Sequence, residues 1–352
     1  MEKKPDAIYI KNSEEPHIDD NFFYVTGLHQ GLFEGSAAIL YPDGNIDLVV
    51  PQLEFESAKK ANVNINVYKS EEEFYDILKE SLSSLQNIGL NFKGISLKDF
   101  LKLKNKLSTP DFFDASEAFE KTRLIKDELE IRLIKNACEI VDNVVKKIPE
   151  ILHDGMHEFE LAAEIDYLMQ KNGADKSAFE TISSFGKNTA EPHYSHGDTK
   201  LNMGDFVLCD FGANFRKYNS DITRTFVFGK ISEQQKEMYE TVMKAQQIAF
   251  DKIRDGLKGL EVHKAVDSFI ESTKFKGRFI HSTGHSLGLA VHDGGYRLSQ
   301  NCELELKENM VFTIEPGVYL PGIGGIRIED DVLIKKDGLE ILTKSPRELI
   351  EV

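Results

Sequence analysis

Carboxylates inside apolar strands are the first sign of chemistry in this sequence. Residues 206–211 alternate as in a strand, so Asp210 shares a face with large apolar side chains. A second strand is expected over 221–228, and an antiparallel hairpin would bring its first residue, Asp221, close to Asp210. Like charges across a hairpin are destabilising, and a bound cation would relieve them. The alternative is that one aspartate is solvated at a strand end.

The later part of the chain repeats this pattern. A strand expected over 310–315 ends in Glu315, directly before a Pro-Gly pair. Another expected strand, 326–334, places Arg327 and Glu329 on one face. A single Glu in a strand is usually an edge residue. Acidic side chains in four apolar strands of one domain favour a shared binding site instead.

Histidines supply nitrogen donors near these acids. The candidates are His281, His285 and His292 in HSTGHSLGLAVHD, and His193 in EPHYSHG. Gly284 and Gly288 flank His285 and let the backbone come close to a site. The alternative for a single His is a core or surface position, but three within so short a segment favour a common role.

Charge counting favours two metal ions over one. Four carboxylates carry four negative charges, which two divalent cations balance, and a neutral imidazole adds a ligand without adding charge. A single Zn²⁺ would leave two buried acids uncompensated. Paired metals lie about 3.5–4 Å apart and hold a water or hydroxide between them. Oxygen ligands with one His suit Mn²⁺, Co²⁺, Fe²⁺ or Zn²⁺, so the metal identity stays open.

An internal repeat indicates how these residues are positioned. The segments 152–166 and 253–267 share acidic and glycine positions, among them Gly155 and Gly256. The segments 201–212 and 306–317 align next and place Asp210 opposite Glu315. We expect a pseudo-twofold α/β domain in which each half supplies two helices, strands and carboxylates near the axis.

Residues 1–117 are expected to form a separate, smaller α/β domain, leaving 118–352 for the repeat. Apolar runs at 37–41 and 46–50 flank a Pro-Asp-Gly-Asn turn, which predicts a hairpin. No chemistry-bearing motif occurs in this part. A helix with a capping box is expected to begin after Asp127 and to be stopped by Pro149. Its apolar spacing includes Cys138, which we therefore assign to the core rather than to catalysis.

Length and composition describe an ordinary globular chain. At about 150 residues per domain, the 352 residues suggest two domains or one large one. Apolar residues make up 41%, which excludes collagen-like, disordered and low-complexity classes. The net charge of −16 argues against partners such as nucleic acid or an anionic membrane surface, since both are negatively charged.

Cysteine use and hydropathy favour a cytoplasmic location. Cys138, Cys209 and Cys302 are isolated, so neither a disulfide framework nor a zinc knuckle is expected. The first residues contain no apolar signal-peptide core, and no run of about 18 apolar residues occurs. We therefore expect a reducing compartment and no membrane partner.

These residues resemble the metallopeptidases with the pita-bread fold, family M24, which includes methionine aminopeptidase, aminopeptidase P and prolidase. The family pattern is an Asp, a second Asp in the next strand, a His within T-G-H-x-x-G, a Glu before Pro-Gly and a Glu within R-I-E-D. The matching positions are Asp210, Asp221, His285, Glu315 and Glu329. The resemblance implies a catalytic pita-bread domain over 118–352.

The resemblance also implies metal roles. By position, Asp221 would chelate one metal ion, while Asp210 and Glu329 would bridge two ions. His285 and Glu315 would complete the coordination of the other ion. The family favours homodimers, so a homodimer is expected.

An additional N-terminal domain places the resemblance in the creatinase/prolidase branch. Methionine aminopeptidases lack such a domain, whereas residues 1–117 have about its size. His193, His292 and Arg327 occupy positions typical of members that cleave next to proline. The resemblance therefore implies hydrolysis of Xaa-Pro bonds in small peptides, first of all dipeptides.

One segment departs from the family pattern. The usual His-Glu-x-Pro is His-Asp-Gly-Gly over residues 292–295, with a shorter acid and no proline. This leaves the pocket wall and the exact substrate open, but not the metal centre. Tyr296 and Arg297 follow directly and are candidates for contacting substrate. His281 is expected to contact the metal ligands without binding metal itself.

The expected reaction is hydrolysis of the peptide bond before proline. A hydroxide between the metal ions would attack the carbonyl, and Glu315 would take up and return the proton. His292 or His193 would donate a hydrogen bond to the oxyanion. Arg327 would hold Asp221 or bind the substrate carboxylate, because its planar fork suits either role.

The sequence leaves three alternatives to a dipeptidase. Aminopeptidase P acts on longer peptides, and comparing dipeptides with tripeptides separates the two. Creatinase-like hydrolysis works without metal, so the complete ligand set argues against it. A pseudo-peptidase used as a binding scaffold belongs to another class, and metal content would distinguish it.

Overall fold

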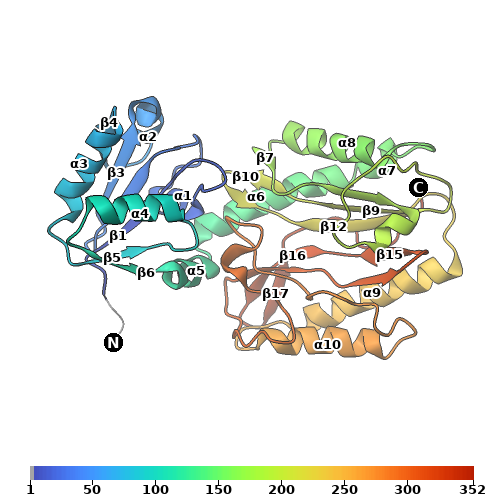
Figure 1. The fold of residues 1–352 in the computed structure, drawn as a ribbon. Helices are drawn as coiled ribbons and strands as arrows, with labels where there is room; N and C mark the ends of the chain where they lie inside the picture. The colour runs from blue at the N-terminus through green and yellow to red at the C-terminus, as the bar shows by residue number, and fades with distance from the viewer. Residues whose placement is uncertain (1–3) are drawn as a thin grey trace. The chain divides into compact units, whose positions relative to one another are not determined.

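The structure, a computed structural model, describes residues 4–352, and the contacts divide the chain into two units, up to Thr122 and from Arg123 onward (Figure 1). Residues 1–3, the start of the expected first domain, lie outside the described residues. The boundary expected between residues 117 and 118 falls inside helix α5 (Ser116–Leu124) and stays a prediction.

The first unit is built on a six-stranded sheet in the order β4-β3-β2-β1-β5-β6. Its strands are β1 (Ala7–Lys11), β2 (Ala37–Leu40), β3 (Ile46–Pro51), β4 (Asn64–Tyr68), β5 (Asn87–Leu90) and β6 (Asp111–Asp114). Its helices before α5 are η1 (Gln52–Glu54), α1 (Asp20–Thr26), α2 (Phe55–Ala58), α3 (Glu71–Leu82) and α4 (Leu97–Lys106). The predicted hairpin is confirmed, because β2 and β3 pair antiparallel.

Alternation along these strands buries both faces of the sheet. Tyr9 and Val49 pack with residues of α3 and α4, whereas Ile10 and Leu48 pack with residues of α1, α2 and α5. The first unit is therefore a sheet between two helical layers, which is the α/β arrangement expected for it.

The second unit consists of two halves of similar construction. The first half contains α6 (Glu128–Val145), α7 (Ile148–Ile151), α8 (Glu158–Lys171), β7 (Lys176–Ser177), β8 (Ile182–Phe185), η2 (Gly186–Ala190), β9 (Phe206–Phe211), β10 (Ala213–Phe215), β11 (Tyr218–Asn219) and β12 (Ile222–Val227). The second contains α9 (Glu233–Lys252), α10 (Gly259–Glu271), η3 (Asp293–Gly295), β13 (Val311–Ile314), β14 (Gly317–Leu320), β15 (Gly324–Arg327), β16 (Asp330–Lys335) and β17 (Gly338–Ile341).

Helix α6 begins as predicted and ends earlier than predicted. Asp127 and Glu130 form the capping box. The helix ends at Val145, and Pro149 instead lies in the first turn of α7, where its missing N–H is tolerated. Cys138 is fully buried, as its place on the apolar face predicts.

The repeat predicted from the sequence is confirmed by equivalent backbone contacts. The amide of Gly155 donates to the carbonyl of Leu201 at 2.9 Å, and the amide of Gly256 donates to that of Leu306 at 2.8 Å. Both glycines have positive φ, 77° and 81°, which side chains with a Cβ rarely adopt. The same turn therefore opens the second helix of each half.

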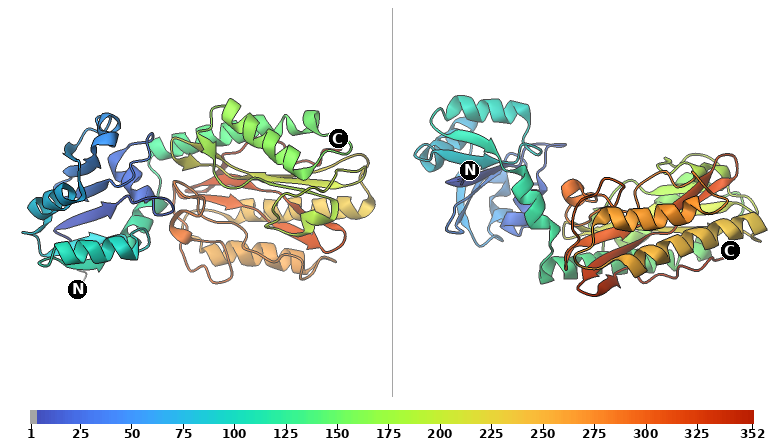
Figure 2. Two further views of the ribbon diagram at one scale, coloured as in Figure 1. Left: turned by 45° about the horizontal axis from the view of Figure 1, so that its top comes forward. Right: turned by 90° about the horizontal axis from the view of Figure 1, so that it is seen from below.

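The two halves meet along β12 and the chain between β15 and β16. The amide of Glu329 donates to the carbonyl of Thr223 at 3.1 Å, and the amide of Arg327 donates to the hydroxyl of Thr225 at 3.3 Å. Helices α6 and α8 pack on β9 and β12, and α9 and α10 pack on the strands of the second half (Figure 2). The acidic strands thus lie in the middle of this unit. Among the described residues, no helix combines the length and apolar character needed to cross a bilayer.

Candidate metal centre

Asp210 and Asp221 come together as predicted, but diagonally. In the β9–β12 pairing, Thr223 is the residue opposite Asp210, and Asp221 precedes β12. Both aspartates are buried. Burial, reinforced by the charges of Glu329 and Asp210, raises the pKa of Asp221 well above its usual value.

The second half contributes two glutamates to the same place. The single strand expected over 326–334 is wrong, because the chain is divided there into β15 and β16, which pair with different strands, and Glu329 lies in the break. The Thr223 hydroxyl donates to Oε2 of Glu329 at 2.6 Å. Glu315 follows β13, and the Thr313 hydroxyl lies 3.4 Å from its Oε1. Burial raises the pKa of both carboxyls, that of Glu315 to about 7, and the neighbouring carboxylates contribute.

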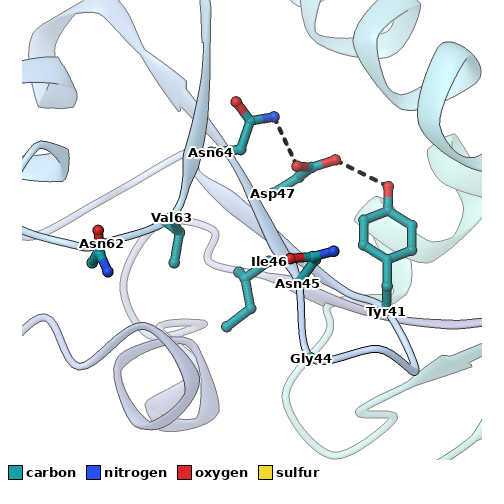
Figure 3. A pocket seen from close by; sticks show the side chains of 8 residues that line it. All are labelled: Tyr41, Gly44, Asn45, Ile46, Asp47, Asn62, Val63 and Asn64. Atoms are coloured by element: carbon teal, nitrogen blue, oxygen red, sulfur yellow. Dashed lines mark hydrogen bonds between the residues drawn. The ribbon is translucent and has the colours of Figure 1, made fainter.

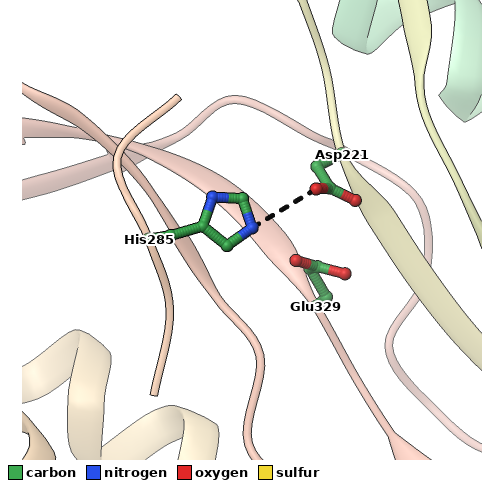
Figure 4. A group of neighbouring side chains, drawn as sticks. All are labelled: Asp221, His285 and Glu329. Atoms are coloured by element: carbon green, nitrogen blue, oxygen red, sulfur yellow. Dashed lines mark ion pairs between the residues drawn. The ribbon is translucent and has the colours of Figure 1, made fainter. Parts of the chain in front are cut away.

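His285 faces these carboxylates with its Nε2 atom. Ligand atoms of Asp221, His285 and Glu329 lie within 4.8 Å of one another (Figure 4). The Nε2 of His285 is 3.5 Å from Oδ2 of Asp221 and 3.7 Å from Oε1 of Glu315. Its Nδ1 is 3.3 Å from the carbonyl of Ser286, so the proton belongs on Nδ1 and Nε2 is free to bind a cation. Burial lowers the pKa of His285 to about 3, which keeps the ring neutral.

This donor set fits divalent cations. The Oδ1 atoms of Asp210 and Asp221 are buried and have no hydrogen-bond partner among the described residues. Buried polar atoms are normally paired, and an ionised carboxylate is strongly disfavoured without a countercharge. Oxygen atoms from carboxylates with one neutral imidazole form a ligand set that Mn²⁺, Co²⁺, Fe²⁺ and Zn²⁺ accept.

Arg327 contacts Asp210 rather than the expected Asp221. Its Nη2 donates to Oδ2 of Asp210 at 2.5 Å, its Nη1 to the Tyr319 hydroxyl at 2.9 Å and its Nε to the Thr223 hydroxyl at 3.0 Å. The strand register explains the difference, because Thr223 and Asp210 face each other directly and Asp221 does not. The guanidinium is buried and already bonded at all three nitrogens.

His281 lies beside this network. Its Nδ1 is 2.8 Å from the carbonyl of Ser282, and its Nε2 is 2.9 Å from the Tyr319 hydroxyl. Burial, with the Arg327 charge, lowers the pKa of His281 to about 3. The neutral ring therefore donates from Nδ1 and accepts from Tyr319. Tyr319 was missed by the sequence analysis, because nothing in its own motif marks it as part of the site.

His193 and His292, the other two candidate histidines, are exposed. The ring of His292 packs edge-on against that of His285, with centroids 4.3 Å apart. His193 lies on the loop after η2, where the carbonyl of the preceding Pro192 lies 3.4 Å from Nη1 of Arg327. The charge of His193 contributes to lowering the pKa of His281 and His292, so it borders the same site.

The two substrate candidates after the His-Asp-Gly-Gly segment differ in their surroundings. Tyr296 is half-buried and packs against the core of the second half. Arg297 is exposed, and its charge helps to lower the pKa of both His285 and His292. Arg297 is therefore the better placed of the two to meet an anionic group at the site.

A hollow of about 470 Å³ in the first unit offers no comparable chemistry (Figure 3). Its acidic residue is Asp47, whose two oxygens already accept hydrogen bonds from the Tyr41 hydroxyl at 3.0 Å and from the Asn64 amide at 2.8 Å. The carboxylate is thus engaged within the protein, and the hollow is a surface feature of the hairpin.

Comparison with known proteins gives a family match for both parts of the chain. Residues 132–336 match Metallopeptidase family M24, and residues 1–125 match the Creatinase/Prolidase N-terminal domain. The chain is 40% identical over 336 residues to an Xaa-Pro dipeptidase of Pyrococcus horikoshii, covering 94% of this chain and 92% of that protein.

Solved structures agree over nearly the whole length. An X-Pro aminopeptidase from Thermotoga maritima superposes with a TM-score of 0.93 at 33% identity, covering 99% of this chain and 98% of that one. The prolidase from Pyrococcus furiosus gives a TM-score of 0.87 at 37% identity, covering 97% of each chain. These matches confirm the expected fold class. The chain therefore belongs to metallopeptidase family M24 and carries the creatinase/prolidase N-terminal domain ahead of its peptidase domain.

Proposed function

We propose that this metallopeptidase is a dinuclear-metal Xaa-Pro dipeptidase. The observation that carries the proposal is the convergence of Asp221, His285 and Glu329 within 4.8 Å. It occurs in a chain whose curated relatives at 38–40% identity are Xaa-Pro dipeptidases. The substrate is a small peptide with proline after the scissile bond.

The ligands proposed for two divalent ions are Asp210, Asp221, His285, Glu315 and Glu329. When bound, Mn²⁺, Co²⁺, Zn²⁺ or Fe²⁺ would polarise the scissile carbonyl and lower the pKa of a water molecule. We revise the roles of the two aspartates. Asp221 is the better candidate for the ligand shared by both ions, because it lies beside His285 and Glu329, whereas one oxygen of Asp210 is taken by Arg327.

Glu315 is proposed to take up a proton and return it to the leaving amine. Its carboxyl lies next to His285, and a carboxylate beside the attacking water can act first as general base and then as general acid. The Thr313 hydroxyl beside Oε1 orients the carboxyl. Arg327 is proposed to hold Asp210 in place. The substrate carboxylate, the other group expected to bind Arg327, would then bind a different cation.

His292 and His193 are proposed to bind the substrate and the tetrahedral oxyanion. Both are exposed rings at the border of the buried cluster, so each can donate a hydrogen bond outward. His281 is proposed as a neutral supporting residue, since it is held between Ser282 and Tyr319.

The test is hydrolysis of Leu-Pro and Met-Pro against Xaa-Pro-Yaa tripeptides, with Mn²⁺, Co²⁺ and Zn²⁺ in turn. We expect metal-dependent cleavage of the dipeptides, abolished in His285→Ala with the circular dichroism spectrum unchanged. Lys258→Met, which removes only the exposed ion pair with Glu303, serves as the control with wild-type activity.

Three results would contradict the proposal. Preference for tripeptides would assign the chain to the aminopeptidase P type. A folded protein that binds no divalent metal would indicate a pseudo-peptidase scaffold. An active His285→Ala enzyme would remove this residue from the ligand set.

We also propose a cytoplasmic homodimer. The location is supported by Cys138, Cys209 and Cys302, which are all buried free thiols, as expected in a reducing compartment. The dimer rests on the family resemblance alone, and light scattering on the purified chain would give the mass that decides it.

A further inference from the structure

The chain from His285 to Asp293 folds back on itself. The amide of Asp293 donates to the carbonyl of Ser286 at 2.9 Å, and the Ser286 hydroxyl donates back to the carbonyl of Asp293. These bonds bring His292 over His285, where the rings meet at 83°. The place of His292 therefore depends on where Asp293 is held.

The Asp293 carboxylate is held by two cations from a distant segment. Nη2 of Arg123 donates to Oδ1, and Nζ of Lys126 lies 3.2 Å from Oδ2. Lys126 also donates to the carbonyl of Arg123 at 2.6 Å, which links the two cations to each other. Asp293 and Lys126 are 2% and 1% exposed. Charge-assisted hydrogen bonds shielded from water in this way are strong and geometrically specific.

Gly288 shows how closely this cluster is packed. A Cβ at this position would lie 2.1 Å from Oδ2 of Asp293 and 3.1 Å from Cε of Lys126. The second glycine of the T-G-H-x-x-G motif therefore leaves room for the carboxylate. The motif that contains the ligand His285 is thus in direct contact with the clamp formed by Arg123, Lys126 and Asp293.

Two glycines follow Asp293 directly in the chain. Gly294 and Gly295 both have positive φ, 71° and 75°. Glycine pairs restrict the backbone little, and the proline that the family pattern has in this segment is missing. The side chain of Asp293 therefore adds a constraint to the loop that carries His292, beyond the backbone bonds that join Ser286 to Asp293 and to Tyr296.

We propose that Asp293, clamped by Arg123 and Lys126, is a positioning residue that sets the place of His292 at the active site. The inference rests on the proposed function of His292. Asp293, the shorter acid of the His-Asp-Gly-Gly segment, therefore keeps a specific packing contact, because its carboxylate fills the space over Gly288.

The first test is Asp293→Asn, assayed on Leu-Pro with the metal-loaded enzyme. An amide cannot match two cations, so we expect kcat/KM to fall about 10–100-fold, mainly through kcat, with metal content unchanged. Lys126→Met, which leaves the Arg123 contact in place, should give a smaller loss in the same direction. Lys135→Met is the matched control, since it removes a half-exposed lysine of helix α6 that pairs with Glu340 of β17.

A double-mutant cycle separates positioning from general structure. In the His292→Ala background, Asp293→Asn should add almost nothing, because the residue it positions is gone. Equal losses in both backgrounds, or wild-type kcat in Asp293→Asn, would overturn the inference while leaving the proposed function standing.

A second readout does not depend on activity. In protein labelled at histidine ¹³Cε1, the signal lost in His292→Ala identifies His292. That signal should shift in Asp293→Asn and in Gly288→Ala, which keeps every charge, but not in Lys135→Met. An unmoved signal in both variants would overturn the inference. If the wild type failed to cleave Xaa-Pro peptides, the proposed function would fall and this measurement would still decide the clamp.

Discussion

The two aspartates of the site carry the same charge in different surroundings. One oxygen of Asp210 is bonded to the buried Arg327 guanidinium. Asp221 instead faces His285 and two glutamates, and no lysine or arginine among residues 4–352 forms an ion pair with it. Coulomb repulsion among buried carboxylates is large in a low-dielectric interior. Asp221 therefore depends more on bound metal than Asp210 does.

Substituting each aspartate by Asn should separate their roles. Asp221→Asn is expected to bring bound metal close to zero, because a shared ligand serves both ions. Asp210→Asn is expected to leave about one ion per chain, since the other ligands remain. Elemental analysis after dialysis measures both, with circular dichroism to check the fold. Equal stoichiometry in the two variants would contradict the assignment.

At the scale of elements, the same kind of turn precedes the second helix in each half of the second unit. Gly155 and Gly256 adopt the same backbone conformation and bond to equivalent carbonyls in front of α8 and α10. Each turn fixes a helix against the strand that carries a carboxylate. The repeat thus places the proposed ligands of both halves through equivalent local structure.

Gly155→Ala and Gly256→Ala should destabilise the protein by similar amounts. No atom lies within 4 Å of the added Cβ at either site, so the effect is the left-handed backbone alone, about 1–2 kcal/mol. Chemical denaturation of each variant measures the free energy of unfolding, and the double variant should give the sum. A large effect at one glycine and none at the other would contradict the equivalence.

At the scale of the whole molecule, all proposed ligands belong to the unit that begins at Arg123. Without metal, the folded protein binds a proton at Glu315 more tightly than the unfolded chain does, because the pKa rises from 4.5 to about 7. The stability that this proton gives is present below about pH 4.5 and is lost as the pH rises to about 7. Metal binding replaces it, since the ligands are then deprotonated.

Calorimetry with metal or with EDTA tests this linkage. We expect the difference in Tm between loaded and metal-free protein to widen from pH 5 towards pH 7, and only the transition of the second unit to move. The transition of the first unit, which holds none of the ligands, is the internal control. A difference in Tm that shrinks with rising pH would contradict the raised pKa values.

The sequence by itself determined the residue types and their order. Strand alternation placed Asp210 in an apolar strand, the repeat related the two halves, and the motif around His285 predicted the nitrogen ligand. The single strand predicted over 326–334 was wrong, because the chain breaks at Glu329 between β15 and β16. These features are local, because each depends on a few neighbouring residues and the period of one element. The capping box at Asp127 and the β2–β3 hairpin were predictable for the same reason.

Only the tertiary structure decided which partner each charged group contacts. Arg327 bonds to Asp210 across 117 positions of the chain, and Asp293 meets Arg123 across 170. Such pairs depend on strand register and on the packing of distant elements, which no local period encodes. The sequence thus predicted which acidic groups gather at one site, and folding decided which of them pairs with Arg327 and which we propose as metal ligands.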